Sequence, residues 1–260
     1  MRALTGRRGF LVAIATLSLA TVACDQSARR TSDAIESSTA VTFEAGGVEL
    51  SGRLFGPEDA PVGVVLAHML PADQSAWYVT AGRLADQGYR VLTFDFRGFC
   101  PGGDAGCSEG ELDVDAAPVD LAAALDYLRS QGVSRAGLVG ASMGGTAALV
   151  VAAGEGDDVG AVVTLSAPEG IEGLTAGPEV LQRVNGAKLF VAGTGDATAA
   201  AAAETFFDES LQPKRVEIVT SDDHGTDLLT GNQGERVYGL LEGWLLAHVP
   251  PEGQDEGVDE

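Results

Sequence analysis

A serine flanked by glycines lies near the middle of the chain, in the pentapeptide Gly140-Ala-Ser142-Met-Gly144. A short apolar stretch precedes it and an alanine-rich stretch follows it, which predicts a sharp turn from a strand into a helix. Glycines suit such a turn because they let neighbouring backbone approach closely. The free N–H groups of the following helix would favour negative charge beside the serine. The pattern indicates either a mounted nucleophile or a structural glycine turn, and the other residues of a site must decide.

A serine nucleophile needs a general base, and histidine has a pKa suited to that role near neutral pH. The chain has three histidines. His224 follows directly after the last predicted strand and is the predicted base. His68 follows the first of the predicted parallel strands, too early in the chain for this role. His248 ends the last predicted helix beside Pro250 and is interpreted as a surface or C-capping residue.

The imidazole of the base must be oriented by a carboxylate. Asp196 follows a predicted strand through a glycine turn, which places it at the carboxyl edge of the sheet. Its alternative role is to cap the alanine-rich helix that comes next, and one carboxylate can serve both purposes. Asp222, Asp223 and Asp227 lie close to His224 in sequence, but neighbours along an extended loop generally point apart, so Asp196 is the predicted acid.

The scaffold that must position these residues alternates short apolar runs with helical segments. An opening hairpin is predicted over residues 41–54. Later runs lack strict alternation, which is typical of parallel strands buried on both faces; they are 62–67, 89–94, 136–139, 161–165, 188–192 and 216–219. The helical segments are 76–87, 114–130, 143–153, 178–184, 198–210 and 234–248. This alternation predicts an α/β fold with a doubly wound parallel sheet, whose ligands bind at the carboxyl ends of the strands.

The chain order Ser142, Asp196, His224 resembles the catalytic triad of the α/β-hydrolase superfamily, and the resemblance covers residues 41–249. It implies a mostly parallel eight-stranded sheet with an N-terminal antiparallel hairpin. Within the superfamily the chain is most similar to small, lidless serine esterases of the dienelactone-hydrolase type. It departs from dienelactone hydrolases at the nucleophile, where they usually have Cys. Only residues 169–187 are available for a lid, so no large cap domain is expected.

The resemblance also implies an oxyanion hole. One donor is the backbone N–H of Met143, which follows the nucleophile. The second comes from the loop after the first parallel strand, where the family often has His-Gly-X; by this match it is the N–H of Leu70, with Met69 as the alternative. Met69 stands where the family has Gly, and His68 then braces the loop.

Two further features near the expected site have less specific interpretations. The segment Asp95-Phe-Arg97-Gly98 resembles the family's Asp-x-Arg-Gly, for which a salt-bridged structural role is expected. Trp77 and Tyr78 are candidates for lining an acyl pocket, and core packing is their alternative role.

The N-terminus predicts export. Arginines, an apolar run over 10–20 and small residues ending at Ala23 are typical of a signal peptide, assigned to residues 1–23. Cys24 follows directly, which resembles the lipobox of bacterial lipoproteins, although Thr21 departs from its usual Leu, Val or Ile. An extracytoplasmic, membrane-anchored lipoprotein is therefore expected, with a secreted soluble protein as the alternative. Residues 24–40 are predicted to be a flexible tether, 41–249 the hydrolase domain and 250–260 an acidic disordered tail.

Export also bears on the other two cysteines. Cys100 and Cys107 are separated by six residues and are predicted to form a disulfide, with two free thiols as the alternative. A metal pair is disfavoured because no second Cys or His cluster lies nearby to complete four ligands. The net charge of −22 makes nucleic acid a poor partner.

The expected function is hydrolysis of small or short-chain carboxylic esters through an acyl-enzyme. The expected partners are a small-molecule ester and, through lipid on Cys24, a membrane. No metal or organic cofactor is indicated. A non-catalytic lipoprotein of the same fold and an acyltransferase or thioesterase with the same triad are the alternatives, and the sequence does not decide the natural substrate or the oligomeric state.

Overall fold

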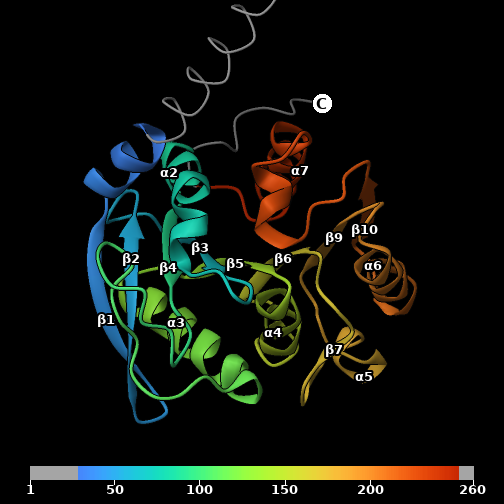
Figure 1. Cartoon of the computed structure of the whole chain (residues 1–260), viewed down its shortest axis with the longest axis horizontal. Coiled ribbons are helices and arrows are strands. Elements are labelled where there is room, and N and C mark those ends of the chain that lie inside the picture. The colour runs from blue at the N-terminus through green and yellow to red at the C-terminus, as the bar shows by residue number, and fades with distance from the viewer. Residues whose placement is uncertain (1–28, 252–260) are drawn as a thin grey trace, which may run out of the picture.

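An eight-stranded sheet forms the centre of the protein in the computed structural model, which describes residues 29–251 (Figure 1). Its spatial order is β1-β2-β4-β3-β5-β6-β9-β10. Only the pairs β1 with β2 and β2 with β4 are antiparallel; the other five pairs are parallel. The strands are β1 (Thr39–Ala45), β2 (Val48–Phe55), β3 (Val62–Ala67), β4 (Arg90–Phe94), β5 (Arg135–Ala141), β6 (Val159–Leu165), β9 (Ala187–Gly193) and β10 (Lys214–Val219).

Helices cover both faces of the sheet. On one face lie α2 (Tyr78–Asp86) and α7 (Gly234–His248). On the other face lie α3 (Ala117–Ser130), α4 (Met143–Ala152) and α6 (Ala197–Glu209). The short helices are η1 (Gln74–Trp77), η2 (Val114–Ala116), α5 (Pro178–Leu181) and η3 (Gly225–Leu229).

The strand sequences explain this three-layer arrangement. Along β3, Val64 and Leu66 pack into the core beneath α2 and α7, whereas Val65 and Ala67 pack into the core beneath α3 and α4. Successive side chains of a strand point to opposite faces, so a strand with helices on both sides must be apolar at every position. This is why the central runs lack alternation, and why two separate apolar cores sandwich one sheet.

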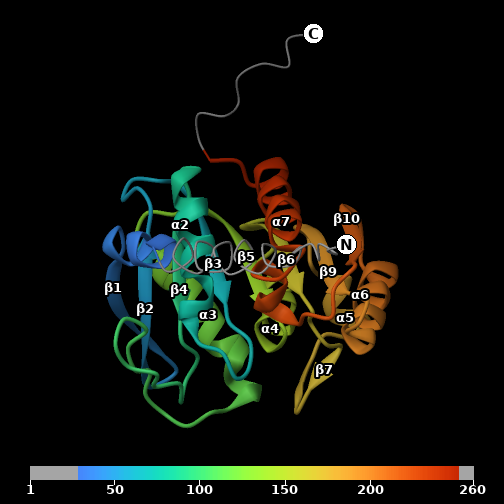
Figure 2. The same cartoon turned by 45° about the horizontal axis from the view of Figure 1, so that its top comes forward.

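The predicted fold class is confirmed: a mostly parallel eight-stranded sheet with an antiparallel N-terminal pair and no large cap domain. The six predicted parallel strands all form, with ends shifted by at most two residues. Between β6 and β9 lie only α5 and a small hairpin, β7 (Gly170–Ile171) and β8 (Leu174–Thr175), which the sequence did not predict. Figure 2 shows this hairpin projecting from the body of the protein.

The segments that flank the domain are partly described. Residues 29–36, within the predicted tether, are helical, and the buried Ala34 lies against Gly82 of α2. At the other end Pro251, within the predicted tail, is buried beside Gly88. The predicted signal peptide and Cys24 lie outside the described residues. Within residues 29–251 no helix has the length and apolar character needed to cross a membrane.

Candidate active site

Ser142 occupies a strained turn between β5 and α4. Its backbone has φ 48° and ψ −118°, in the region that favours glycine. The N–H of Ser142 donates to the carbonyl of Leu165 at the end of β6 (2.8 Å), which holds the turn against the neighbouring strand. A Cβ at Gly140 would overlap the backbone of Gly144, and one at Gly144 would lie 2.5 Å from the carbonyl oxygen of Ala67. The flanking glycines are therefore required by close backbone approach.

The helix that follows Ser142 is anchored at its first turn. The carbonyl of Ser142 accepts hydrogen bonds from Gly145 and Thr146, and the Thr146 hydroxyl donates to the carbonyl of Pro168 (2.7 Å). The side chain of Met143 is buried in the core, so Met143 can serve a substrate only through its backbone. The N–H group of Met143, the first residue of α4, lies at the positive dipole end of the helix.

His224 and Asp196 are brought together from two loops. Asp196 follows β9 and His224 follows β10, and the Nδ1 of His224 lies 2.5 Å from Oδ2 of Asp196. Because a carboxylate accepts the proton on Nδ1, the neutral imidazole leaves Nε2 free as a proton acceptor. The His224 side chain is 43% exposed, so it remains accessible to a bound molecule.

Asp196 also caps helix α6. Its Oδ1 accepts from the N–H of Ala199 (3.4 Å) while Oδ2 faces His224. The two roles considered for this residue therefore use different oxygens of one carboxylate. The competing acid Asp223 accepts from the hydroxyl of Ser221 (2.6 Å), and Asp227 donates its N–H to the carbonyl of His224.

The loop that holds His224 contacts the turn at Ser142 through Gly225. This residue has φ 57°, and a Cβ on it would overlap the sulfur of Met69 and lie 3.5 Å from Cβ of Ala141. The residue after His224 thus packs between the residue before Ser142 and the loop after β3. Within residues 29–251 no hydrogen bond joins the Ser142 hydroxyl to His224.

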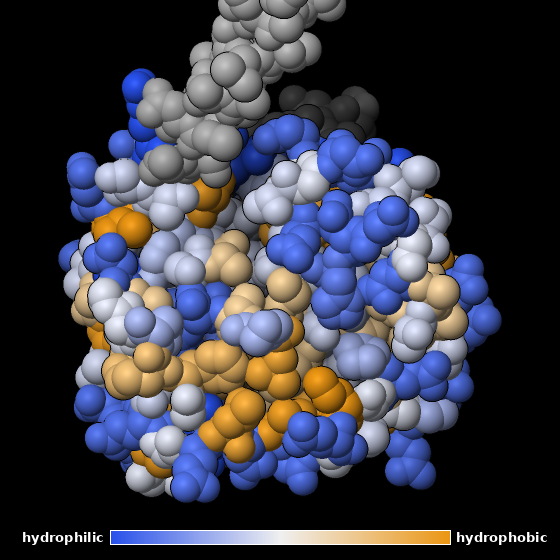
Figure 3. All heavy atoms as spheres, viewed as in Figure 1, coloured by the Kyte–Doolittle hydropathy of each residue, from blue (hydrophilic) through white to orange (hydrophobic). Residues whose placement is uncertain are grey.

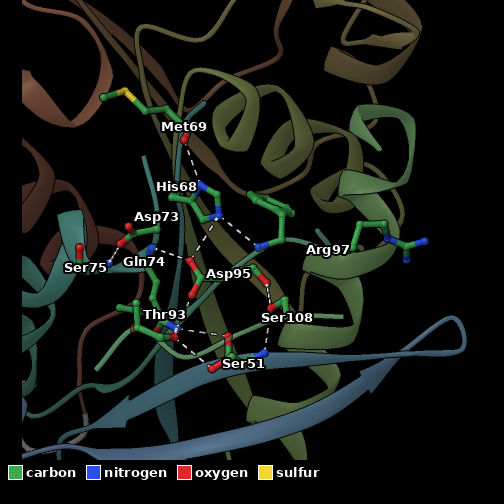
Figure 4. A network of polar contacts seen from close by, with 12 residues as sticks. Ser51, His68, Met69, Asp73, Gln74, Ser75, Thr93, Asp95, Arg97 and Ser108 are labelled. Atoms are coloured by element: carbon green, nitrogen blue, oxygen red, sulfur yellow. Dashed lines mark hydrogen bonds and ion pairs between the residues drawn. The ribbon is translucent and has the colours of Figure 1, made fainter. Parts of the chain in front are cut away.

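His68 fixes the loop that follows β3 (Figure 4). Its Nε2 accepts from the N–H of Phe96 (3.1 Å), so the ring proton is on Nδ1, which lies 2.9 Å from the carbonyl of Met69. Burial lowers the pKa of His68 to about 4, which keeps the ring neutral in this arrangement. The Met69–Leu70 peptide bond is not among the cis bonds. In a trans peptide the C=O and N–H point in opposite directions, so the Leu70 N–H is directed away from His68.

A buried carboxylate stands behind this loop. Asp95 accepts from the backbone N–H and the side-chain amide of Gln74, both at 2.8 Å, and Thr93 donates to the Oε1 of Gln74 (2.8 Å). Burial raises the pKa of Asp95 to about 7, although both hydrogen bonds from Gln74 oppose that shift. Sequence reasoning missed Gln74, because a lone glutamine in a loop carries no motif.

The structure joins Cys100 and Cys107 in a disulfide. Two backbone carbonyls of the loop that it closes accept hydrogen bonds from buried side chains. Tyr78 donates to the carbonyl of Asp104 (2.8 Å), and Ser51 donates to that of Ala105 (3.0 Å). Gln74 also donates to Ala105. The disulfide loop is therefore connected through Gln74 to the network behind the β3 loop.

Arg97 ties the same region to helix α3. Its guanidinium lies 2.6 Å from the buried carboxylate of Asp120, and this hydrogen bond raises the pKa of Arg97. The salt-bridged role expected for the Asp95-to-Gly98 segment is thus filled by Arg97 with Asp120, whereas Asp95 bonds Gln74. Trp77 and Tyr78 are both buried, so they pack in the core and do not line an open acyl pocket.

Two cavities lie away from these residues. One of about 920 Å³ lies between the helix at 29–36 and α2, and one of about 250 Å³ lies near His248. Neither is lined by Ser142, Asp196 or His224. Within the described part of the chain, no group of three or more His, Cys, Asp or Glu side chains is arranged to hold a metal ion.

The mostly parallel, doubly wound sheet with its antiparallel N-terminal pair is the arrangement expected for the α/β-hydrolase fold. Residues 63–222 match the family described as the alpha/beta hydrolase fold, and the chain belongs to this family. None of the curated proteins matches the chain in sequence.

Solved structures share this fold at low sequence identity. A dienelactone hydrolase from Anabaena variabilis superposes with a TM-score of 0.66 at 24% identity, over 81% of this chain and 97% of that one. An esterase from Pyrococcus furiosus gives 0.64 at 19% identity, over 81% and 91%. An enol-lactonase from Burkholderia xenovorans gives 0.63 at 19% identity, over 79% and 99%. At such identities the likeness establishes the fold alone.

Proposed function

We propose that this protein is a serine hydrolase of carboxylic esters, with Ser142 as nucleophile, His224 as general base and Asp196 as the acid that orients it. One observation carries the proposal: a serine at φ 48° on the strand-to-helix turn, whose neighbour Ala141 lies against Gly225, the residue after a histidine whose Nδ1 is held by a carboxylate at 2.5 Å. A strained backbone at such a turn is stabilised by the surrounding structure and is typical of functional sites.

The reaction follows from the free Nε2 of His224. As the Ser142 oxygen attacks the carbonyl carbon, its proton passes to Nε2, and Asp196 stabilises the resulting imidazolium. The C–O bond to the alcohol then breaks, and His224 returns the proton to the departing alkoxide. Water attacks the acyl-enzyme by the same route and releases the acid. The hydrogen bond between serine and histidine commonly tightens only with substrate bound.

The oxyanion would be stabilised by two backbone N–H groups, those of Met143 and Leu70. Met143 opens a buried helix that begins directly at the nucleophile. Leu70 is favoured over Met69 because His68 binds the carbonyl of the Met69–Leu70 peptide. The N–H of Leu70, on the other side of this peptide, is therefore directed away from His68. Such donors are already in position before the reaction begins, so no free energy is spent on rearranging them. Each therefore contributes about a hundredfold or more to kcat.

Small-molecule esters, and not long-chain lipids, are the proposed substrates. The segment between β6 and β9 holds only the β7–β8 hairpin and α5, and His224 is 43% exposed. Structural relatives named as dienelactone hydrolase, esterase and enol-lactonase act on ester bonds, in keeping with this proposal. Acyl transfer to an alcohol or thioester cleavage would use the same three residues, and only product analysis separates these reactions from ester hydrolysis.

The proposal is tested with purified residues 25–260 and p-nitrophenyl acetate and butyrate. Ser142→Ala should lower kcat by at least about a thousandfold, because removing a triad member abolishes nucleophilic catalysis. Ser134→Ala is the matched control, since Ser134 is exposed at the opposite end of β5. Activity that survives Ser142→Ala would contradict the triad. No turnover of either ester by the unmodified protein would favour a non-catalytic protein.

A further inference from the structure

An apolar surface borders the proposed site. Figure 3 shows apolar side chains gathered across the face seen in Figure 1, over the start of α3, α4 and the β7–β8 hairpin. Four partly or largely exposed apolar side chains lie on the loops around the proposed site and on the β7–β8 hairpin: Leu70, Phe99, Leu112 and Ile171, here called the apolar strip. Leu70, Phe99 and Ile171 pack on the same core that holds Met143.

Contacts link the strip to the site and join its members. The ring of Phe99 lies edge-on to that of His68, 4.5 Å between centroids, and His68 holds the carbonyl before Leu70. Gly98, the neighbour of Phe99, lies so close to the backbone of Leu112 that a Cβ on it would overlap Leu112. The strip therefore begins at the proposed oxyanion donor and runs outward to Leu112.

The β7–β8 hairpin closes the far side. Its entry is fixed to α4 by the hydrogen bond from Thr146 to Pro168. At its tip a Cβ on Gly173 would overlap the carboxylate of Asp115, so the tip rests against the segment just after Leu112. Ile171, paired with Leu174 in the hairpin, is partly exposed and packs against the same core as Leu70 and Phe99.

One member of the strip, Leu112, is unusual for this surface. Among the described residues only Leu112, Val119 and Leu211 are exposed large apolar side chains. The protein carries a net charge of −22, and hydrophilic side chains cover much of the face in Figure 3. Contiguous apolar surface beside a site commonly marks a ligand-binding region.

We propose that the apolar strip binds the acyl chain of the ester, so that the protein prefers medium-length acyl groups over acetyl. This rests on the proposed function, since the chain is placed by attachment to the carbonyl carbon at Ser142. The strip starts at the loop that bears the Leu70 N–H, and a chain leaving the bound carbonyl can pass directly onto it. A half-buried chain should raise kcat/KM by about twofold per added methylene.

The test compares p-nitrophenyl acetate, butyrate, hexanoate and octanoate, all below their micelle concentrations. Leu112→Asp and Ile171→Asp should each lower kcat/KM for octanoate by at least about fivefold and leave acetate within about twofold. Leu211→Asp is the matched control: Leu211 is 56% exposed and Leu112 is 54% exposed, but Leu211 lies before β10. This variant should leave the whole series unchanged.

Three outcomes would overturn the proposal. An unchanged ratio of octanoate to acetate rates in both strip variants would show that the chain lies elsewhere. If the strip variants instead lower kcat/KM for acetate esters of butanol and octanol, the alcohol group and not the acyl chain lies on the strip. Activity that rises only above the micelle concentration, and loses that rise in Leu112→Asp, would make the strip a lipid-surface contact.

Failure of the proposed function is distinguishable from failure of this inference. If the unmodified protein hydrolyses no ester, the proposed function fails, and NMR line broadening of sodium octanoate still reports on the strip. Broadening that is lost in Leu112→Asp and kept in Leu211→Asp would support the strip as an acyl-chain site. Equal broadening in all three proteins would contradict it.

Discussion

At the scale of single residues, Asp196 differs from the other acids near His224 because its two carboxylate oxygens make different contacts. One oxygen caps α6 and the other faces Nδ1 of His224. The capping bond fixes the carboxylate by its attachment to a helix, so the histidine is oriented by secondary structure and not by a mobile loop. The cap of α6 and the contact with His224 each constrain the same rotamer of Asp196.

This double role predicts different results for two substitutions of Asp196. Asp196→Asn keeps an oxygen for the cap but favours the wrong imidazole tautomer, so kcat should fall by about 10⁴ with little change in thermal stability. Asp196→Ala should lose similar activity and also destabilise the protein by about 1 kcal/mol through loss of the cap. Ester hydrolysis rates and denaturant titrations of both variants measure the two effects. Equal stability of the Asn and Ala variants would contradict the capping role.

At the scale of elements, the sequence predicted what depends on periodicity and on turn chemistry. Runs apolar at every position gave the parallel strands, and the bounds of α7 match the predicted 234–248. The β7–β8 hairpin was missed because each strand has two residues, too short for a period. Gln74 and the pairing of Arg97 with Asp120 were missed because they depend on which loops meet in space. The helix at 29–36 lies in a polar stretch whose single buried residue, Ala34, gives no amphipathic pattern.

Replacing glycine by alanine should change stability in opposite directions at two helical positions, because Gly144 beside the Ser142 turn is closely packed and Gly239 is not. Gly144→Ala would bring a methyl group to 2.5 Å from the Ala67 carbonyl oxygen, so we expect a loss of stability of about 2 kcal/mol or more and a loss of activity. Gly239→Ala meets no atom within 4 Å on the exposed side of α7 and should stabilise the protein by about 0.5 to 1 kcal/mol. Chemical denaturation of both variants checks the signs, and a neutral Gly144→Ala would show that the turn is looser than described.

At the scale of the whole molecule, three layers leave the carboxyl ends of β3, β5, β9 and β10 at one edge of the sheet. The four loops that leave these ends hold His68, Ser142, Asp196 and His224 in turn. Behind them, His68 and Asp95 are buried titratable groups whose Nε2 and Oδ1 atoms are 3.8 Å apart. Because the pKa of each group is shifted in the folded protein, each group makes its own contribution to the pH dependence of stability.

The two groups of this pair act in opposite directions. The pKa of Asp95 is raised from 3.8 to about 7, so between these values the folded protein holds a proton that the unfolded chain has lost, and stability falls as pH rises. The pKa of His68 is lowered from 6.5 to about 4, so the unfolded chain binds the extra proton, and stability rises with pH over that window. Between about pH 4 and 6.5 the two contributions largely cancel in the unmodified protein.

Asp95→Asn removes one side of this balance while keeping an oxygen that can accept from Gln74. In this variant only His68 contributes over that window, so its stability should rise from pH 4 to 6.5 more steeply than that of the unmodified protein. Relative to the unmodified protein, the variant should gain on the order of 4 kcal/mol between pH 4 and 8, because it lacks the Asp95 proton that the folded protein keeps and the unfolded chain releases. Urea titrations at half-unit pH steps measure both curves. A stability difference that stays constant with pH would show that Asp95 titrates at its ordinary value in the folded protein.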